Sequence, residues 1–141
     1  MPARLRNFII DPGADFVRVL AIADSAGEPL DMTGGGYSAR LRILNDDGTE
    51  LLVLSSATDA VVLGNGTITI DSDKAVADAL DLAGLARRGT ITEPAPPLEG
   101  STEPQPDYVA FGPLADCEFY LTEPGDLDSR LLKGLVCFAS R

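Results

Sequence analysis

Three consecutive glycines, Gly34 to Gly36, lie shortly before Arg40 and Arg42, and glycines followed by arginines suggest an anion-binding site. Glycine-rich loops bind phosphate when they lead into a helix, whose first backbone N–H groups point at the anion. This triplet leads into a strand-like run instead, and it lacks the spaced glycines, lysine and hydroxyl of a phosphate loop. We interpret it as a backbone that needs positive φ, or as an irregular start of a strand.

The carboxylates suggest two other kinds of chemistry. Acidic residues cluster in segments 45–48, 71–73 and 124–129, but none has the spacing of an EF-hand calcium loop. Paired carboxylates could hydrolyse a glycosidic bond, yet among 22 acidic residues some close pair is inevitable and carries no information. The chain has no histidine to act as a general base or a metal ligand. We predict no enzymatic activity, no metal site and no cofactor.

Charge and hydropathy limit the classes of partner. The formal net charge is −11, with 22 acidic and 11 basic residues, and such a surface repels nucleic acid. No apolar run is long enough to cross a bilayer, and the one before Asp11 is too short for the core of a signal peptide. We expect a cytoplasmic protein with no nucleic-acid partner and no membrane insertion.

Two cysteines, Cys117 and Cys137, lie near the end of the chain. If residues 117–121 and 131–138 form a hairpin, the two side chains face each other, and a disulfide between them is geometrically conceivable. The alternative is a pair of small buried apolar residues, as expected where thiols stay reduced. Without histidine, two cysteines this far apart cannot form a zinc site.

Short apolar or alternating runs between turn residues predict six to eight strands. In residues 37–43 the odd-numbered side chains, among them Tyr37, should face the core, and Ser38, Arg40 and Arg42 should face solvent. Asp47-Gly48 and residues 64–66 read as hairpin turns. One helix is expected after Asp71 or Ser72, ending at Gly84 or Gly89. The pattern favours a single mainly β domain over residues 1–141, an antiparallel β-sandwich with one short α-helix.

Two features suggest contacts with other proteins. Residues 93–107 hold five of the ten prolines, several acids and few apolar residues, so we predict an extended loop or arm. Arg40 and Arg42 could form, with Arg18, a basic strip that binds a neighbour's carboxylates. The alternative is a solvated sheet face whose arginines pair with acids across the strands.

The order of motifs resembles a family of small bacteriophage and prophage tail proteins. The matching pattern is a "GADF" motif at 13–16, then Asp24, Gly27 and Pro29, then "DMTG" at 31–34 and "ARLRI" at 39–43. A "GTITI" strand at 66–70 and the terminal "LLKGLVCF" also fit. The chain departs from the family's pattern in two places. It has two extra glycines, and the proline-rich segment 90–107 is inserted where relatives pass almost directly from the helix to the next strand.

The resemblance implies an immunoglobulin-like β-sandwich in a virion, without catalytic residues. We expect an adaptor or assembly component of a phage tail (baseplate, tail tip or fibre attachment), assembled in the bacterial host cytoplasm. It should form a homo-oligomer within the particle and bind other virion structural proteins. The alternatives are a capsid decoration protein, or a glycan-binding module that uses Tyr108 and Phe111. The residues expected at a protein interface are Arg40, Arg42, Pro94, Pro96, Pro97, Leu98, Pro104 and Pro106.

Overall fold

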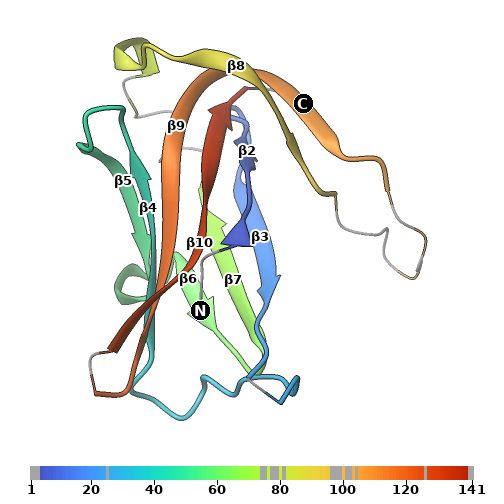
Figure 1. Ribbon diagram of the computed structural model, residues 1–141, viewed down its shortest axis with the longest axis vertical. Helices are drawn as coiled ribbons and strands as arrows, with labels where there is room; N and C mark the ends of the chain where they lie inside the picture. The colour runs from blue at the N-terminus through green and yellow to red at the C-terminus, as the bar shows by residue number, and fades with distance from the viewer. Residues whose placement is uncertain are drawn as a thin grey trace.

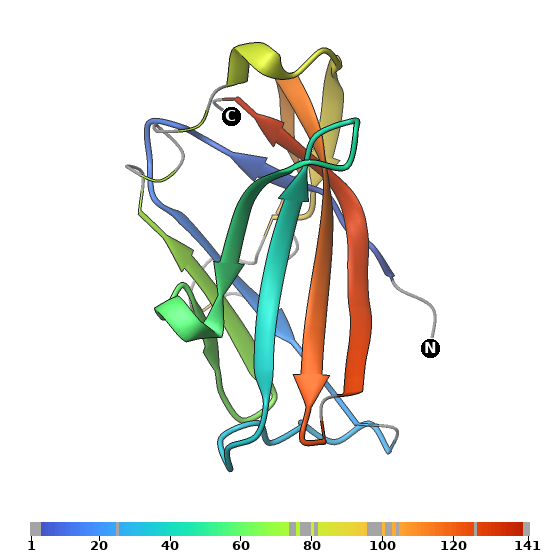
Figure 2. The same ribbon diagram turned by 90° about the vertical axis from the view of Figure 1, so that its left-hand side faces the viewer.

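Two β-sheets of unequal size build the fold, as a computed structural model shows (Figures 1 and 2). It describes residues 4–24, 26–73, 76, 80, 82–95, 100, 103, 105–125 and 127–139. The large sheet contains β1 (Arg4–Leu5), β2 (Phe8–Ile10), β4 (Ser38–Leu44), β5 (Glu50–Ser55), β8 (Arg88–Glu93), β9 (Tyr108–Glu123) and β10 (Leu127–Phe138). The small sheet contains β3 (Phe16–Ala21), β6 (Val61–Leu63) and β7 (Thr67–Ser72).

Strand order shows how the sheets are made. The large sheet runs β1-β10-β9-β4-β5, with β2 also on β10 and β8 on β9, and the small sheet runs β3-β7-β6. The described strands pair antiparallel, except that β1 and β2 run parallel to β10. The mainly β prediction is therefore confirmed, in the form of curled sheets of which the larger is mixed.

The hairpins that the sequence predicts are present. β4 and β5 join through Asp47-Gly48, where the Gly48 amide donates to the Asn45 carbonyl. β6 and β7 join through residues 64–66, and β9 pairs with β10 along most of its length. Residues 108–123 form one sixteen-residue strand, β9.

Alternation along β4 decides which side chains enter the core. Ala39, Leu41 and Ile43 are buried and the two arginines between them are partly exposed, which confirms the predicted faces. They pack with apolar side chains of both sheets, including Phe119 of β9 and Ile70 of β7. Tyr37 is partly buried against this core. Burial of these apolar faces holds the two sheets together.

Two predictions about local structure need correction. Asp71 and Ser72 do not cap a helix, because they end β7 and pair with β3. Arg88 and Gly89 do not end one either, because they pair with β9 at the start of β8. Between these strands Val76 is helical and Leu82–Gly84 forms one 3-10 turn. Residues 74–75, 77–79 and 81 of the predicted helix lie outside the described residues.

The cysteines do not face each other across the hairpin. Cys117 pairs with Gly134 and Cys137 pairs with Leu114, and both cysteines are free and buried. They pack in separate apolar clusters, Cys117 in the main core and Cys137 in a smaller cluster with Ile9. The register of β9 on β10 is the reason that the proposed disulfide does not form.

The glycine triplet lies in the loop before β4. Gly35 and Gly36 have φ of +86° and +82°, as the sequence interpretation requires. A side chain at Gly36 would also press against Pro124, in the turn between β9 and β10. The triplet thus shapes the loop where β4 begins.

The N-terminal strands, which the sequence analysis did not predict, dock closely on β10. The Arg6 amide donates to the Lys133 carbonyl, and Asn7 Oδ1 accepts from the Leu135 amide. A Cβ atom at Gly134 would overlap the Arg6 carbonyl. Only glycine at this position lets the two backbones approach as they do.

Gly134→Ala should therefore lower the free energy of unfolding by about 1–3 kcal/mol, the usual cost of overpacking. Urea unfolding followed by circular dichroism measures this change. Gly34→Ala is the matched control, since Gly34 has ordinary φ and open space around it, and it should change stability little. Equal stability of the two variants would contradict the close docking of residues 4–10.

Candidate functional site

Arg40 and Arg42 lie on the outer face of the large sheet, but Arg18 does not join them. Arg18 is in β3 of the small sheet, where its side chain is only 14% exposed and bonded to Glu93. The prediction that Arg18 joins Arg40 and Arg42 in a basic strip is therefore wrong. The signal was in the sequence, because a lone charge within the apolar run 16–23 needs a buried partner.

Strand pairing brings other cations beside Arg40 and Arg42. Arg40 lies across from Tyr120, which lies across from Arg130. Arg42 lies across from Glu118, which lies across from Lys133. We call these four cations the cationic strip: Arg40, Arg42, Arg130 and Lys133.

Two side chains of β9, the Glu118 carboxylate and the Tyr120 ring, hold the arginines of the cationic strip. Glu118 accepts a hydrogen bond from Arg130 at 2.7 Å and lies 3.6 Å from an Arg42 nitrogen. Arg42 also contacts Glu50 at 3.2 Å, and the Arg40 guanidinium stacks 4.5 Å from the centre of the Tyr120 ring. These cross-strand pairs match the alternative in which the arginines pair with acids on a solvated face.

Charge in the cationic strip stays positive. The hydrogen bond from Arg130 lowers the pKa of Glu118 below its ordinary value, so this carboxylate is ionised at neutral pH. Four cations then surround two carboxylates, those of Glu118 and Glu50. Exposed ion pairs contribute only about 0–1 kcal/mol each to stability, so the arrangement does more for surface charge than for folding. At one end of this face Arg87 contacts Asp46 and Asp116.

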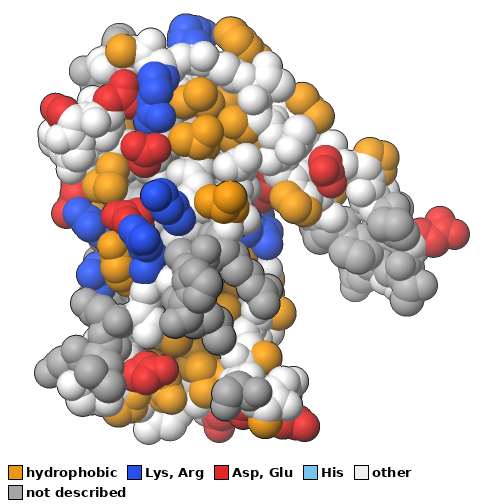
Figure 3. Space-filling view, in the orientation of Figure 1, with side chains coloured by type: hydrophobic (Ala, Val, Ile, Leu, Met, Phe, Trp, Pro, Cys, Tyr) orange, Lys and Arg blue, Asp and Glu red, His pale blue; other side chains and the backbone are white. Residues whose placement is uncertain are grey.

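The proline-rich segment is carried on a projecting hairpin. Residues 90–93, which the sequence assigned to the arm, belong to β8 and pair with 108–111 of β9. We call β8, residues 108–113 and their connection the arm hairpin, and residues 94–107 the arm tip. Figure 1 shows the arm hairpin leaving the top of the molecule and running to the right, away from β4 and β5. Figure 3 shows an open notch between it and the body.

The two faces of the arm hairpin differ. On the inner face Ile91 and Ala110 pack with Ile9 and Cys137. On the outer face Val109 and Phe111 are 55% and 60% exposed, and Arg88 lies 5.8 Å from the centre of the Phe111 ring. Large apolar side chains exposed together on one face are typical of an interaction site.

Of the predicted arm contacts, only some are described. Pro94 and Pro106 are exposed at the two ends of the arm tip, as are Glu103 and Asp107. Pro96, Pro97, Leu98 and Pro104 lie outside the described residues. β8 and residues 108–113 lead away from the face that carries Arg40 and Arg42, so the structure does not join the predicted arm contacts to these two arginines (Figures 1 and 2). Pro94 does line a common groove with Arg130 and Lys133 of the cationic strip.

A buried ion pair fixes the root of the arm hairpin. Arg18 Nε and Nη2 donate to the two oxygens of Glu93 at 2.5 and 2.8 Å, and Glu93 is fully buried. Glu93 Oε1 also accepts from the Ile9 amide at 2.9 Å, and Arg18 Nη2 donates to the Ile9 carbonyl at 3.1 Å. We call this arrangement the Arg18–Glu93 clamp. It joins the small sheet, β2 and the end of β8.

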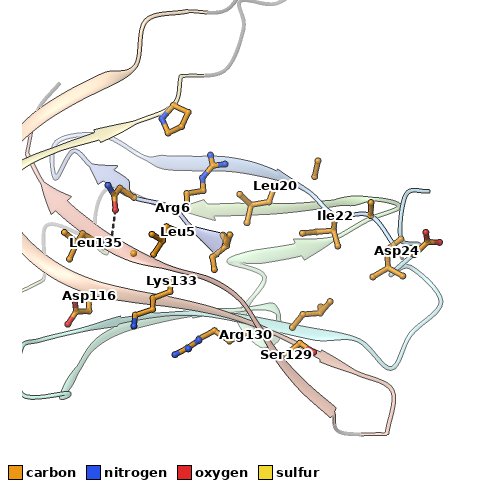
Figure 4. Close-up of a pocket in the computed structure, with 18 of the residues that line it drawn as sticks. Leu5, Arg6, Leu20, Ile22, Asp24, Asp116, Ser129, Arg130, Lys133 and Leu135 are labelled. Atoms are coloured by element: carbon orange, nitrogen blue, oxygen red, sulfur yellow. Dashed lines mark hydrogen bonds between the residues drawn. The ribbon is translucent and has the colours of Figure 1, made fainter. Parts of the chain in front are cut away.

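A groove opens between β10 and β3. Figure 4 shows Arg130 and Lys133 along β10, with Leu20 and Ile22 across the groove and Leu5 of β1 beside Lys133. Its lining is mainly apolar and carries both signs of charge, since Asp24, Asp116 and Glu123 also line it. Arg130 and Lys133 belong to both the groove and the cationic strip, so the two surfaces adjoin.

Features of other functional classes are missing from the part of the chain that the structure describes. There, no three histidine, cysteine or acidic side chains come together as metal ligands. No helix among those residues has the length and apolar character needed to span a bilayer.

Comparisons with protein-family models, with curated proteins and with solved structures found no match to this chain. The likeness to small phage tail proteins thus depends on the sequence motifs alone.

The Arg18–Glu93 clamp can be tested by removing one charge. Glu93→Gln leaves a buried arginine without its counter-charge, so we expect a loss of about 3–5 kcal/mol in the free energy of unfolding. Glu103→Gln, at an exposed position of the arm tip, should change it by less than about 0.5 kcal/mol. Arg18→Met/Glu93→Gln should lose less than the two single variants together. A Glu93→Gln protein as stable as the wild type would contradict the clamp.

The two thiols should be inert in the folded protein. Burial raises the pKa of Cys117 to about 12 and raises that of Cys137 above its ordinary value, so neither forms a thiolate at pH 8. Ellman's reagent should detect no thiol in the native protein and two per chain in guanidinium chloride. Rapid native labelling, or a disulfide formed by mild oxidation, would contradict the described register of β9 and β10.

Proposed function

We propose that this protein is a non-enzymatic structural component of a virion, an adaptor or assembly protein of a phage tail. The sequence likeness at 13–43 and 66–70 suggests this class, and with it an immunoglobulin-like arrangement of the two sheets. The β-rich fold with an apolar core shared by both sheets is compatible with such an arrangement. A rigid β body would serve as a spacer between neighbouring subunits.

The arm hairpin is the main observation that supports this proposal. It projects from the body, its outer face exposes Val109 and Phe111, and its root is fixed by Glu93 (Figure 1). The outer face of this hairpin is left exposed by its own subunit, whereas a neighbour can bury it. Permanent assemblies gain large contact areas in this way.

The alternatives differ in how well the geometry supports them. A capsid decoration protein would use the same arm on a different lattice. A glycan-binding module needs aromatic rings on one surface, but Tyr108 packs inward against the cluster around Ile9 while Phe111 points outward. Residues 108 and 111 lie on opposite faces of β9, because side chains alternate along a strand. The glycan-binding alternative therefore has the weaker support.

Replacing residues 94–107 by Asn-Gly tests the role of the arm tip. Glu93 and Tyr108 are paired in register, so a two-residue turn can close the hairpin and keep the Arg18–Glu93 clamp. A deletion that began at residue 93 would remove the buried carboxylate. We expect a folded variant that no longer enters virions when it is the sole copy of the protein in the producing cells.

Quantitative mass spectrometry of purified particles measures this occupancy. The control is Gly34→Ala, which leaves the arm hairpin and the cationic strip intact. Normal occupancy of the truncated protein would contradict a role of the arm tip in assembly. Absence of the wild-type protein from the particles would contradict the proposed function itself.

A further inference from the structure

Opposite charges lie at the two ends of this molecule, one set on the arm tip and the other on the cationic strip. We propose that the arm tip of one copy docks on the cationic strip of a second copy, in a head-to-tail contact. This proposal rests on the proposed function, because it names the partner that the arm would bind in an assembly.

Charge complementarity is the first argument. The arm tip contains Glu99, Glu103 and Asp107 and no cation. In the cationic strip four cations surround two carboxylates, although the whole chain has 22 acidic and 11 basic residues. Arg42 and Arg130 are held by Glu118, and Arg40 is held against Tyr120. Guanidinium groups held in place lose less entropy when they bind a carboxylate.

The direction of the hairpin favours a second copy. β8 and residues 108–113 run out on one side of the molecule, and the outer face of β4, β9 and β10 looks to the opposite side (Figures 1 and 2). Cationic side chains gather over β9 and β10, with acidic side chains among them (Figure 3). The Arg18–Glu93 clamp fixes the direction in which β8 leaves the body.

The sizes of the two surfaces agree. From β4 to β10 the strip crosses two strand spacings, about 10 Å. Half of the arm tip, roughly seven residues, spans up to about 23 Å when extended. One extended half can therefore lie across the whole strip, with length left over to reach the groove beside it.

The groove beside β10 suits the remaining side chains of the arm tip. Leu20 and Ile22 line it across from Arg130 and Lys133, and Leu5 of β1 lies beside Lys133 (Figure 4). The arm tip contains five prolines and Leu98 beside its three acids. Extended proline-rich segments bind to apolar grooves with little loss of conformational freedom.

A head-to-tail contact uses two different surfaces, so it leaves one arm and one strip free on every dimer. Such contacts continue until a ring closes or a filament forms. The proposal therefore predicts higher oligomers than a symmetric dimer. Rings of identical subunits are what an adaptor at a symmetric particle axis would supply.

Exchange of charges between the two surfaces tests the contact. The strip variant is Arg130→Glu/Lys133→Glu, and the arm variant is Glu103→Lys/Asp107→Lys. Each carries like charges on both of its surfaces, so each alone should self-associate at least about tenfold more weakly than the wild type. An equimolar mixture should regain assembly, because the arm and strip of each variant are complementary to those of the other.

Sedimentation velocity and mass photometry at 20 mM and at 1 M NaCl measure the association. Salt at 1 M should weaken the wild-type contact, since it screens charges beyond about 3 Å. Glu28→Lys/Asp73→Lys is the matched control for the arm variant, with the same change in net charge at exposed positions outside both surfaces. Lys133→Glu alone provides a milder strip variant if Arg130→Glu impairs folding.

Three results would overturn the proposal: a wild-type protein that stays monomeric at low salt and high concentration, charge variants that associate like the wild type, or a mixture that regains nothing. If any of these occurs while the protein still enters virions, the structural role stands and the arm binds a different protein. Binding of the strip to an unrelated polyanion such as heparin, without self-association, would also reject the second copy as partner.

Discussion

The contact between Arg18 and Glu93 links three parts of the chain that are far apart in sequence. Both carboxylate oxygens of Glu93 accept from Arg18, and the same carboxylate accepts the Ile9 amide, so its charge is neutralised and its hydrogen bonds are made. An ionised carboxylate buried without these partners would be strongly unfavourable. The small sheet, β2 and the end of β8 therefore have to come together as one unit.

That constraint sets the direction of the arm hairpin. Its inner face is held by Glu93 and by Ile91, which packs with Ile9 and Cys137. Its outer face keeps Val109 and Phe111 exposed. The hairpin itself runs to the side away from β4, the strand of Arg40 and Arg42 (Figure 1). A molecule with different binding surfaces on opposite sides is suited to repeated assembly. The proposed function and the proposed self-contact both follow from this geometry.

Local features of the fold could be predicted from the sequence, and distant pairings could not. The alternation of residues 37–43 predicted the faces of β4, because side chains alternate in any strand. The parallel pairing of Phe8 with Val136 and the bond between Arg18 and Glu93 join residues with no local pattern in common. The expected helix up to Gly89 failed because pairing of β8 with β9 outweighs local propensity. Arg40 and Arg42 were found, but their neighbours Arg130 and Lys133 depend on the register of β9 and β10.

Native-state hydrogen exchange at the Ile9 amide tests the central constraint most directly, since this amide donates to the Glu93 side chain itself. If the clamp holds the arm hairpin to the body, the Ile9 amide exchanges only through global unfolding, with the same free energy as amides at the centre of β9. If the Ile9 amide instead exchanges through a local opening of much lower free energy while the centre of β9 stays protected, the Arg18–Glu93 clamp does not hold the arm hairpin to the body.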